Sequence, residues 1–200
     1  MHAWLRWLLP AFFIVYLAAA LVWPTWRTWK RTGINPYALG NSDKAHDYIG
    51  AMFRYSFAVG AAVVIAYGLW PAGYGYLAPV EWLERPALVY AGLGLLAASL
   101  VWTVIAQASL GKSWRIGIDT MNETELVRVG VYRISRNPIF LGMRATLLGL
   151  FLVLPNAVTL AVVVLGEALI QIQVRLEEEF LAARHGPRYA EYRRSTRRWL

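Results

Sequence analysis

Three long stretches without a charged residue constrain this chain more than any other feature. They cover residues 7–26, 55–80 and 86–111, and they contain 20, 26 and 26 residues. A helix needs about 20 apolar residues to cross the hydrocarbon core of a bilayer. The pattern therefore predicts three membrane-spanning helices.

A fourth apolar stretch is too long to be one helix. Residues 137–174 include only two charged side chains, Arg144 and Glu167. As a single helix these residues would extend about 57 Å, nearly twice the ~30 Å hydrocarbon core. Pro155-Asn156 is the turn signal near the middle, so we expect a tight helical hairpin that begins at about Pro138 and ends near Glu179.

The expected fold is an all-α polytopic membrane protein with about five transmembrane helices and a cytoplasmic C-terminal helix. Residues 1–200 form a single membrane domain in this interpretation. Residues 1–110 supply three helices and a cytoplasmic loop. Residues 111–200 supply a second loop, the hairpin and a cytoplasmic tail.

Composition excludes several classes of site. The chain has no cysteine, so it can hold neither a disulfide nor a cysteine-ligated metal. Its three histidines lie outside the long apolar stretches, which argues against a haem held by two intramembrane histidines, and we expect no metal. The net charge of +8 could indicate nucleic-acid binding. The basic residues lie between apolar stretches, however, which indicates a membrane surface and no nucleic acid.

The distribution of lysine and arginine predicts the orientation. Four basic residues lie in residues 27–44, five in residues 112–136 and seven from residue 175 onward, whereas the opposite side has only Arg6 and Arg85. The positive-inside rule then predicts a multi-pass protein of the cell membrane, with its N-terminus outside and its C-terminus in the cytoplasm. A cleaved signal peptide is the alternative for the first stretch, although its apolar run continues past the alanines at 18–20.

The hairpin brings two intramembrane charges to the same depth. Arg144 and Glu167 are each 11 positions from the turn, so we expect an ion pair. A charge at mid-bilayer costs at least about 2.5–3.5 kcal/mol, which favours pairing. The pair could be a structural bridge that locks the hairpin, or the floor of a buried polar pocket.

Counting outward from the same turn places residues 133–138 at the depth of residues 175–179. A basic cluster then faces an acidic one at the cytoplasmic interface. Pro138 suits the first turn of a helix, whose free N–H groups together with Arg133 and Arg136 would favour a carboxylate. The glutamates at 177–179 could hold an ammonium group. A ligand with both charges, such as an amino acid moiety, would fit, but these could also be ordinary juxtamembrane charges.

An ordered set of motifs gives this region a resemblance. The motifs are Leu126-Val127-x-x-Gly130-x-Tyr132-Arg133-x-x-Arg136-Asn137-Pro138-x-Phe140-x-Gly142, then Arg175-x-Glu177-Glu178, then Gly186-x-x-Tyr189-x-x-Tyr192. The combination resembles the isoprenylcysteine carboxyl methyltransferase family and its phospholipid methyltransferase relatives. The resemblance implies an integral membrane methyltransferase that uses S-adenosylmethionine and takes a lipophilic or lipid substrate.

The resemblance also implies site residues. Those expected to contact the cofactor are Thr124, Glu125, Leu126, Val127, Tyr132, Arg136, Asn137, Pro138, Ile139, Phe140, Glu177, Glu178 and Tyr189. Arg175 best matches a substrate-orienting arginine. Glu178 is the candidate base if the methyl acceptor is an amine.

Two positions depart from the family pattern, which commonly has histidine at 137 and tyrosine at 140, where this chain has Asn137 and Phe140. We therefore assign no general base at Asn137. Methylation of a carboxylate needs none, because it requires only an aligned nucleophile within about 3–3.5 Å and the exclusion of water.

The sequence thus favours carboxyl O-methylation of an isoprenylcysteine-like or other lipid-soluble acceptor, with N-methylation of a phospholipid amine as the alternative. A non-catalytic membrane binding protein is a further alternative. A transporter is disfavoured, since no inverted repeat is visible. The sequence does not predict the oligomeric state.

Overall fold

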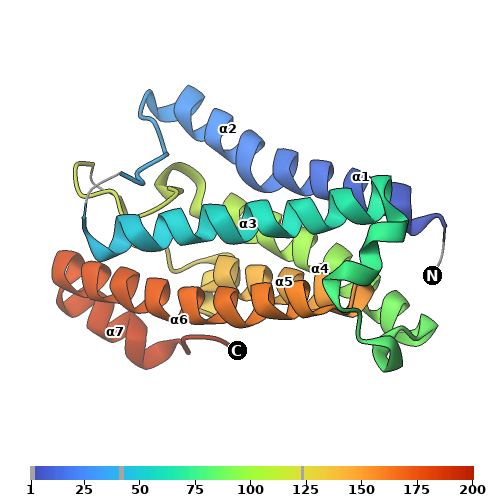
Figure 1. Ribbon diagram of the computed structural model, residues 1–200. Coiled ribbons are helices and arrows are strands. Elements are labelled where there is room, and N and C mark those ends of the chain that lie inside the picture. Colours follow the sequence, from blue (N-terminus) through green and yellow to red (C-terminus); the bar gives the residue numbers. More distant parts are fainter. Residues whose placement is uncertain (1–2, 41–42, 123) are drawn as a thin grey trace.

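The computed structural model describes residues 3–40, 43–122 and 124–200 (Figure 1). These residues form helices and loops with only isolated β-bridges, which confirms the all-α fold. The α-helices are α1 (Leu5–Leu17), α2 (Trp23–Thr32), α3 (Ala45–Leu69), α4 (Pro86–Leu110), α5 (Pro138–Val153), α6 (Ala157–His185) and α7 (Pro187–Ser195).

The first span is longer than predicted. A π-helical segment, Ala18–Val22, joins α1 to α2, and the whole span covers Leu5–Thr32. The irregularity has a local cause, because Pro24 has no N–H with which to satisfy the carbonyl of Ala20, four residues earlier. The side chain of Gln107 on α4 donates to that carbonyl instead, at 2.8 Å.

The second span lies earlier in the chain than predicted. The predicted helix covered residues 55–80, but α3 ends at Leu69 and 3₁₀ turns follow over Pro71–Leu77. Pro71 and the glycines at 73 and 75 stop the helix although the segment stays apolar, so uncharged length alone overestimated it. At its other end α3 begins at Ala45, ten residues earlier than expected.

The hairpin prediction is confirmed, although α6 continues to His185, past the expected end near Glu179. Leu154 and Pro155 connect α5 to α6, and Asn156 caps α6. The Asn156 side chain accepts from the backbone N–H of Thr159 at 3.0 Å, and the Thr159 hydroxyl accepts from the backbone N–H of Asn156 at 3.3 Å. This reciprocal capping box fixes the turn.

The α5 helix is shorter than a standard span. Four helical segments of the described chain are long and apolar enough to cross a membrane, namely Leu5–Thr32, Ala45–Leu69, Pro86–Ser113 and Ala157–His185. The fourth expected span, α5, is the exception, since its 16 residues reach only about 24 Å. It packs closely on α4, because a Cβ at Gly92 would lie 2.8 Å from the carbonyl oxygen of Gly149.

The apolar core and the polar segments occupy opposite ends of the bundle. The core groups Leu5, Leu9, Val63, Val64, Tyr67, Tyr74, Val89, Leu96, Val153 and Leu154 near the hairpin turn. The end of α2, the loop between α4 and α5, the end of α6, and α7 all lie at the other end (Figure 1). That arrangement gathers the candidate site residues in one place.

Candidate active site

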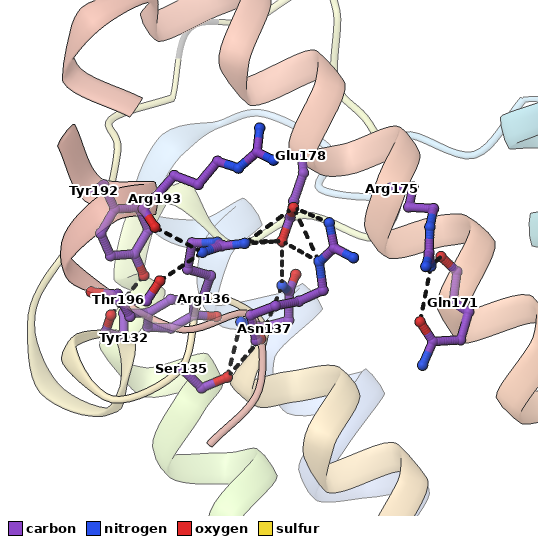
Figure 2. Close-up of polar contacts among 11 residues, drawn as sticks. Tyr132, Ser135, Arg136, Asn137, Gln171, Arg175, Glu178, Tyr192, Arg193 and Thr196 are labelled. Carbon is purple, nitrogen blue, oxygen red and sulfur yellow. Dashed lines mark hydrogen bonds and ion pairs between the residues drawn. The ribbon is translucent and has the colours of Figure 1, made fainter. Parts of the chain in front are cut away.

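A buried carboxylate on α6 is the centre of the polar end (Figure 2). The side chain of Glu178 is 9% exposed and pairs with two arginines. Arg136 Nη2 lies 3.1 Å from its Oε1, and Arg198 Nη2 lies 2.8 Å from its Oε2. Asn137 Nδ2 donates to Oε1 at 3.0 Å. Two positive charges and an amide therefore stabilise the charged form of Glu178.

The segment before α5 holds its side chains in place through local bonds. A 3₁₀ turn, Gly130–Arg133, begins at Gly130, whose φ of +60° favours glycine. The Ser135 hydroxyl then accepts from the backbone N–H of Asn137 at 3.2 Å. Pro138 starts α5, and no side chain among the described residues caps the first turn of that helix. The N-terminus of α5 therefore keeps free donors next to Asn137.

Arg136 connects three parts of the chain. Its guanidinium bonds Glu178 on α6, and its Nη1 donates to the carbonyl oxygens of Thr196 at 2.6 Å and Arg193 at 3.2 Å. With a side chain only 8% exposed, Arg136 is a fixed, buried cation. It joins the α5 entrance, the end of α6 and the end of α7.

The C-terminal residues close one side of this cluster. The carbonyl oxygen of Arg197 accepts from the backbone N–H of Arg136 at 2.9 Å. The carbonyl oxygen of Arg198 accepts from the Ser135 hydroxyl at 3.2 Å and from Asn137 Nδ2 at 3.3 Å. Sequence reasoning missed Arg198 as a site residue, because no spacing within the arginine-rich tail distinguishes it from its neighbours.

Three buried tyrosines surround the cluster. The Tyr192 hydroxyl donates to the backbone carbonyl of Tyr132 at 2.6 Å, and the rings of Tyr189 and Tyr192 pack edge to face at 6.1 Å. Burial raises the pKa of Tyr189 to about 12, so its hydroxyl stays protonated at neutral pH. That hydroxyl and the Nε2 of His185 are buried, and neither has a partner in hydrogen-bonding geometry among the described residues.

The loop before the 3₁₀ turn lies against α6 and α7. Within it, Thr124, Leu126 and Val127 are half-buried, whereas Glu125 is exposed. Arg184 on α6 donates to the carbonyl of Asn122 at 3.2 Å, and Arg128 pairs with Glu191 on α7 at 3.0 Å. These two contacts bring the expected cofactor segment to the helix ends that surround Glu178.

Glu177, next to Glu178 in the sequence, takes part in a separate hydrogen-bond network. Gln173 Nε2 donates to Glu177 Oε1 at 2.8 Å, and the side chain of Gln173 also contacts His46 Nδ1 at 3.3 Å. His46 Nε2 accepts from the backbone N–H of Ile118 at 2.8 Å. Glu177 is thus linked to the α3 entrance and the long loop, and no spacing in the sequence indicated His46 or Gln173.

The sequence model of the family described as phospholipid methyltransferase matches residues 87–188, slightly more than half of the chain. The chain belongs to the phospholipid methyltransferase family. The matched region runs from the start of α4 into α7 and contains Tyr132, Arg136, Asn137 and Glu178. A search of curated proteins found no match.

As a member of this family the protein is a membrane methyltransferase. The matched region also holds three further expected residues at the start of α5. Pro138 is buried at the start of α5, and Ile139 and Phe140 are half-buried in its first turn. These residues lie in the same turn as Asn137, so they are adjacent to the Glu178 cluster.

Arg175 lies outside the Glu178 cluster of the methyltransferase. Its Nη1 donates to the side-chain oxygen of Gln171 at 2.9 Å and to the carbonyl of the same residue. Figure 2 shows this pair on α6 away from Asn137 and Arg136. The exposed side chain of Arg175 points along α6.

The predicted intramembrane ion pair of the methyltransferase is confirmed. Arg144 Nε lies 2.7 Å from Glu167 Oε2, and the two side chains are 33% and 39% exposed. Gln171 Nε2 also donates to Glu167 at 2.8 Å. The ring of Trp199 covers the Arg144 guanidinium at 4.5 Å. A polar stripe therefore runs along α6 from Glu167 through Gln171 to Arg175.

Proposed function

We propose that this protein transfers a methyl group from S-adenosylmethionine to a lipid-soluble acceptor, with the cofactor bound at the Glu178 cluster. The convergence of Glu178, Asn137 and Arg136 at the uncapped start of α5 carries the proposal. All three residues lie in the part of the chain that matches the methyltransferase family.

The residues present fit the charges of this cofactor. Its ammonium group can pair with a buried carboxylate, which Glu178 supplies. Its carboxylate suits the free N–H groups at the start of α5 together with Arg136. The buried Tyr189 hydroxyl and His185 Nε2 offer unused hydrogen-bonding groups near the same helix ends. Phe140 and Tyr132 provide aromatic surface for the adenine.

At least one hydrogen bond from Arg198 to Glu178 must break before a cationic group of the cofactor can reach this carboxylate. A carboxylate accepts about four hydrogen bonds, and Arg136, Asn137 and Arg198 already supply at least that number. Arg198 is the more exposed arginine partner, with a side chain 30% exposed against 8% for Arg136. The C-terminal residues are therefore the part that moves when the cofactor binds.

The bound cofactor supplies an electrophilic methyl group, and the chain supplies binding, orientation and the exclusion of water. The Glu178 carboxylate attracts the positive charge of the cofactor. The arginines and the amide that donate hydrogen bonds to this carboxylate stabilise its charged form and make it a weak base. This property favours an acceptor that needs no deprotonation, such as the carboxylate of an isoprenylcysteine-like lipid, over a phospholipid amine. Arg175, one turn before Glu178 on α6, orients the acceptor's polar group.

The site lies on the cytoplasmic side in this proposal. The segments rich in lysine and arginine share one end of the bundle with Glu178, and the opposite end has few basic residues. The positive-inside rule then places the N-terminus outside and α7 in the cytoplasm.

Transfer of a labelled methyl group to membrane lipid tests the proposal. Purified protein in vesicles of total membrane lipid is incubated with methyl-labelled S-adenosylmethionine, and the lipid is extracted and treated with mild base. We expect labelled lipid from which base releases the label as volatile methanol, because a methyl ester is hydrolysed whereas an N-methyl amine keeps its methyl group. Label that stays non-volatile after base would favour the amine acceptor, and unlabelled lipid with intact cofactor binding would favour a non-catalytic binding protein.

A further inference from the structure

A groove on the far side of α4 from the hairpin belongs to no part of the proposed methyltransferase site. It lies between the π-helical segment with α2 and the end of α4. Its lining includes Trp23, Arg27, Arg31, Gln107 and Trp114. Pro24 and Gln107, which create and stabilise the π-helical segment, both contribute to this groove. Such segments are frequent at functional sites.

Two arginines in the groove are available for a ligand. Arg27 and Arg31 are one helical turn apart on α2, so their guanidinium groups share one face. None of the described residues forms a hydrogen bond or ion pair with either side chain. Lys30 behaves differently, since its ammonium lies 4.9 Å from the centre of the Trp26 ring. The groove therefore presents two positive charges with which no carboxylate of the described residues pairs.

The depth of these arginines suits a lipid headgroup. The first span contains 28 residues and is about 42 Å long, which exceeds the ~30 Å hydrocarbon core. Its last turns must extend into the headgroup region, and these turns carry Arg27 and Arg31. Trp23, Trp26 and Trp29 are exposed around them, as expected for residues at the membrane interface.

An apolar hollow continues from the groove toward the membrane interior. Ala18, Val22, Trp23 and Trp26 line it, and Trp23 belongs to both cavities. The combination offers a polar end with two arginines and an apolar end at the depth of acyl chains. A phospholipid has the same division along its length.

We propose that this groove is a binding site for an anionic phospholipid, with the phosphate at Arg27 and Arg31 and an acyl chain in the hollow beside Trp23. Charge complementarity selects an anionic headgroup over a zwitterionic one. None of the residues that line this groove belongs to the Glu178 cluster. Lipid binding here can therefore be tested whether or not the protein transfers a methyl group. The lipid anchors α2 against the turn that leads from α4 into the loop containing Trp114.

Native mass spectrometry of the full chain tests this site. Detergent-purified protein is titrated with phosphatidylglycerol, with phosphatidylcholine of the same acyl chains, and with soluble glycerol 1-phosphate. We expect a saturable phosphatidylglycerol adduct and weaker phosphatidylcholine binding. In Arg27→Gln/Arg31→Gln, phosphatidylglycerol affinity should fall on the order of tenfold. Adducts with glycerol 1-phosphate of equal affinity would instead show a site for free phosphate and overturn the lipid assignment.

The matched control is Arg188→Gln/Arg194→Gln, which removes the same charge from the exposed face of α7. Phosphatidylglycerol binding to this variant should equal that of the wild type. Equal losses in both variants would show nonspecific attraction and contradict the proposal, as would unchanged binding in the α2 variant. If the double α2 variant does not fold, Trp23→Ala tests the apolar end and should weaken both lipids.

Discussion

The side-chain amide of Asn137 donates to the carboxylate of Glu178 at 3.0 Å, across 41 residues of sequence. The contact joins the start of α5 to the end of α6 in the buried cluster. The family commonly has histidine at position 137, and an asparagine here preserves a donor to Glu178 without a group that titrates near neutral pH. The geometry thus favours a positioning role for Asn137 and no proton transfer.

Asn137→Leu should weaken S-adenosylmethionine binding about tenfold or more, because the amide that positions Glu178 for the cofactor is lost. Asn137→His is the matched variant, since imidazole can also donate to Glu178, and its affinity should stay close to that of the wild type. Calorimetric titration measures both. Equal affinities for Asn137→Leu and the wild type would remove Asn137 from the site.

Arg198→Met should strengthen cofactor binding severalfold, because it removes a cation that competes for Glu178. Arg194→Met, on the exposed face of α7, is the control and should leave the affinity unchanged. The measurement is the dissociation constant of S-adenosylmethionine for each variant. Loss of binding in Arg198→Met would mean that the C-terminal residues form part of the cofactor site, against the displacement proposed above.

Single replacement of Arg144 or Glu167 by leucine should lower the melting temperature, because each leaves one unpaired charge within the membrane region. Such a charge costs about 2.5–3.5 kcal/mol by insertion scales. The double variant, which leaves neither charge, should recover most of the loss. A thermal melt in detergent checks this cycle. Full stability in both single variants would show that the pair does not lock the hairpin.

The loop after α4 should loosen in acid. Burial alone would raise the pKa of Asp119, but hydrogen bonds from Asn122, Arg115 and Met121 outweigh burial and hold this pKa below its ordinary value of 3.8. The folded form is therefore stabilised fully above pH 3.8, and the stabilisation is lost as the pH falls through the lower, folded pKa.

Hydrogen exchange in residues 112–122 as a function of pH measures this effect. Wild-type protection should fall below pH 3.8, whereas Asp119→Asn should have low protection throughout and little pH dependence. Identical pH profiles for the two proteins would show that Asp119 does not hold the loop.

The hairpin and its ion pair could be predicted from the sequence because a tight turn fixes which positions share a depth. Once Pro155-Asn156 was identified as the turn, counting outward gave Arg144 and Glu167. The end of α3 could not be found in the same way, since residues 71–80 are as free of charge as the helix before them. Apolar character reports burial or membrane depth, whereas Pro71 and its neighbouring glycines decide where a helix stops.

Charge patterning and family resemblance both indicated the contact between the start of α5 and the acidic end of α6. The partner of Arg136 was harder to predict. Counting outward from the hairpin turn placed Arg136 at the depth of Arg175, but the structure pairs it with Glu178, almost one helical turn later on α6. Arg198 reaches the same carboxylate through the path of the chain after α7. That path depends on tertiary packing, and no periodicity in an arginine-rich tail encodes it.

Calorimetric titration of the detergent-purified protein with S-adenosylmethionine tests the central claim most directly. The wild type and the variants Glu178→Ala, Tyr132→Ala and Glu179→Ala are compared, with Glu179 as the exposed neighbour of Glu178 on α6. We predict saturable binding in the wild type and in Glu179→Ala, and its loss in the other two variants with the helical content intact. Full binding in Glu178→Ala, or none in a folded wild type, would contradict a cofactor site at Glu178.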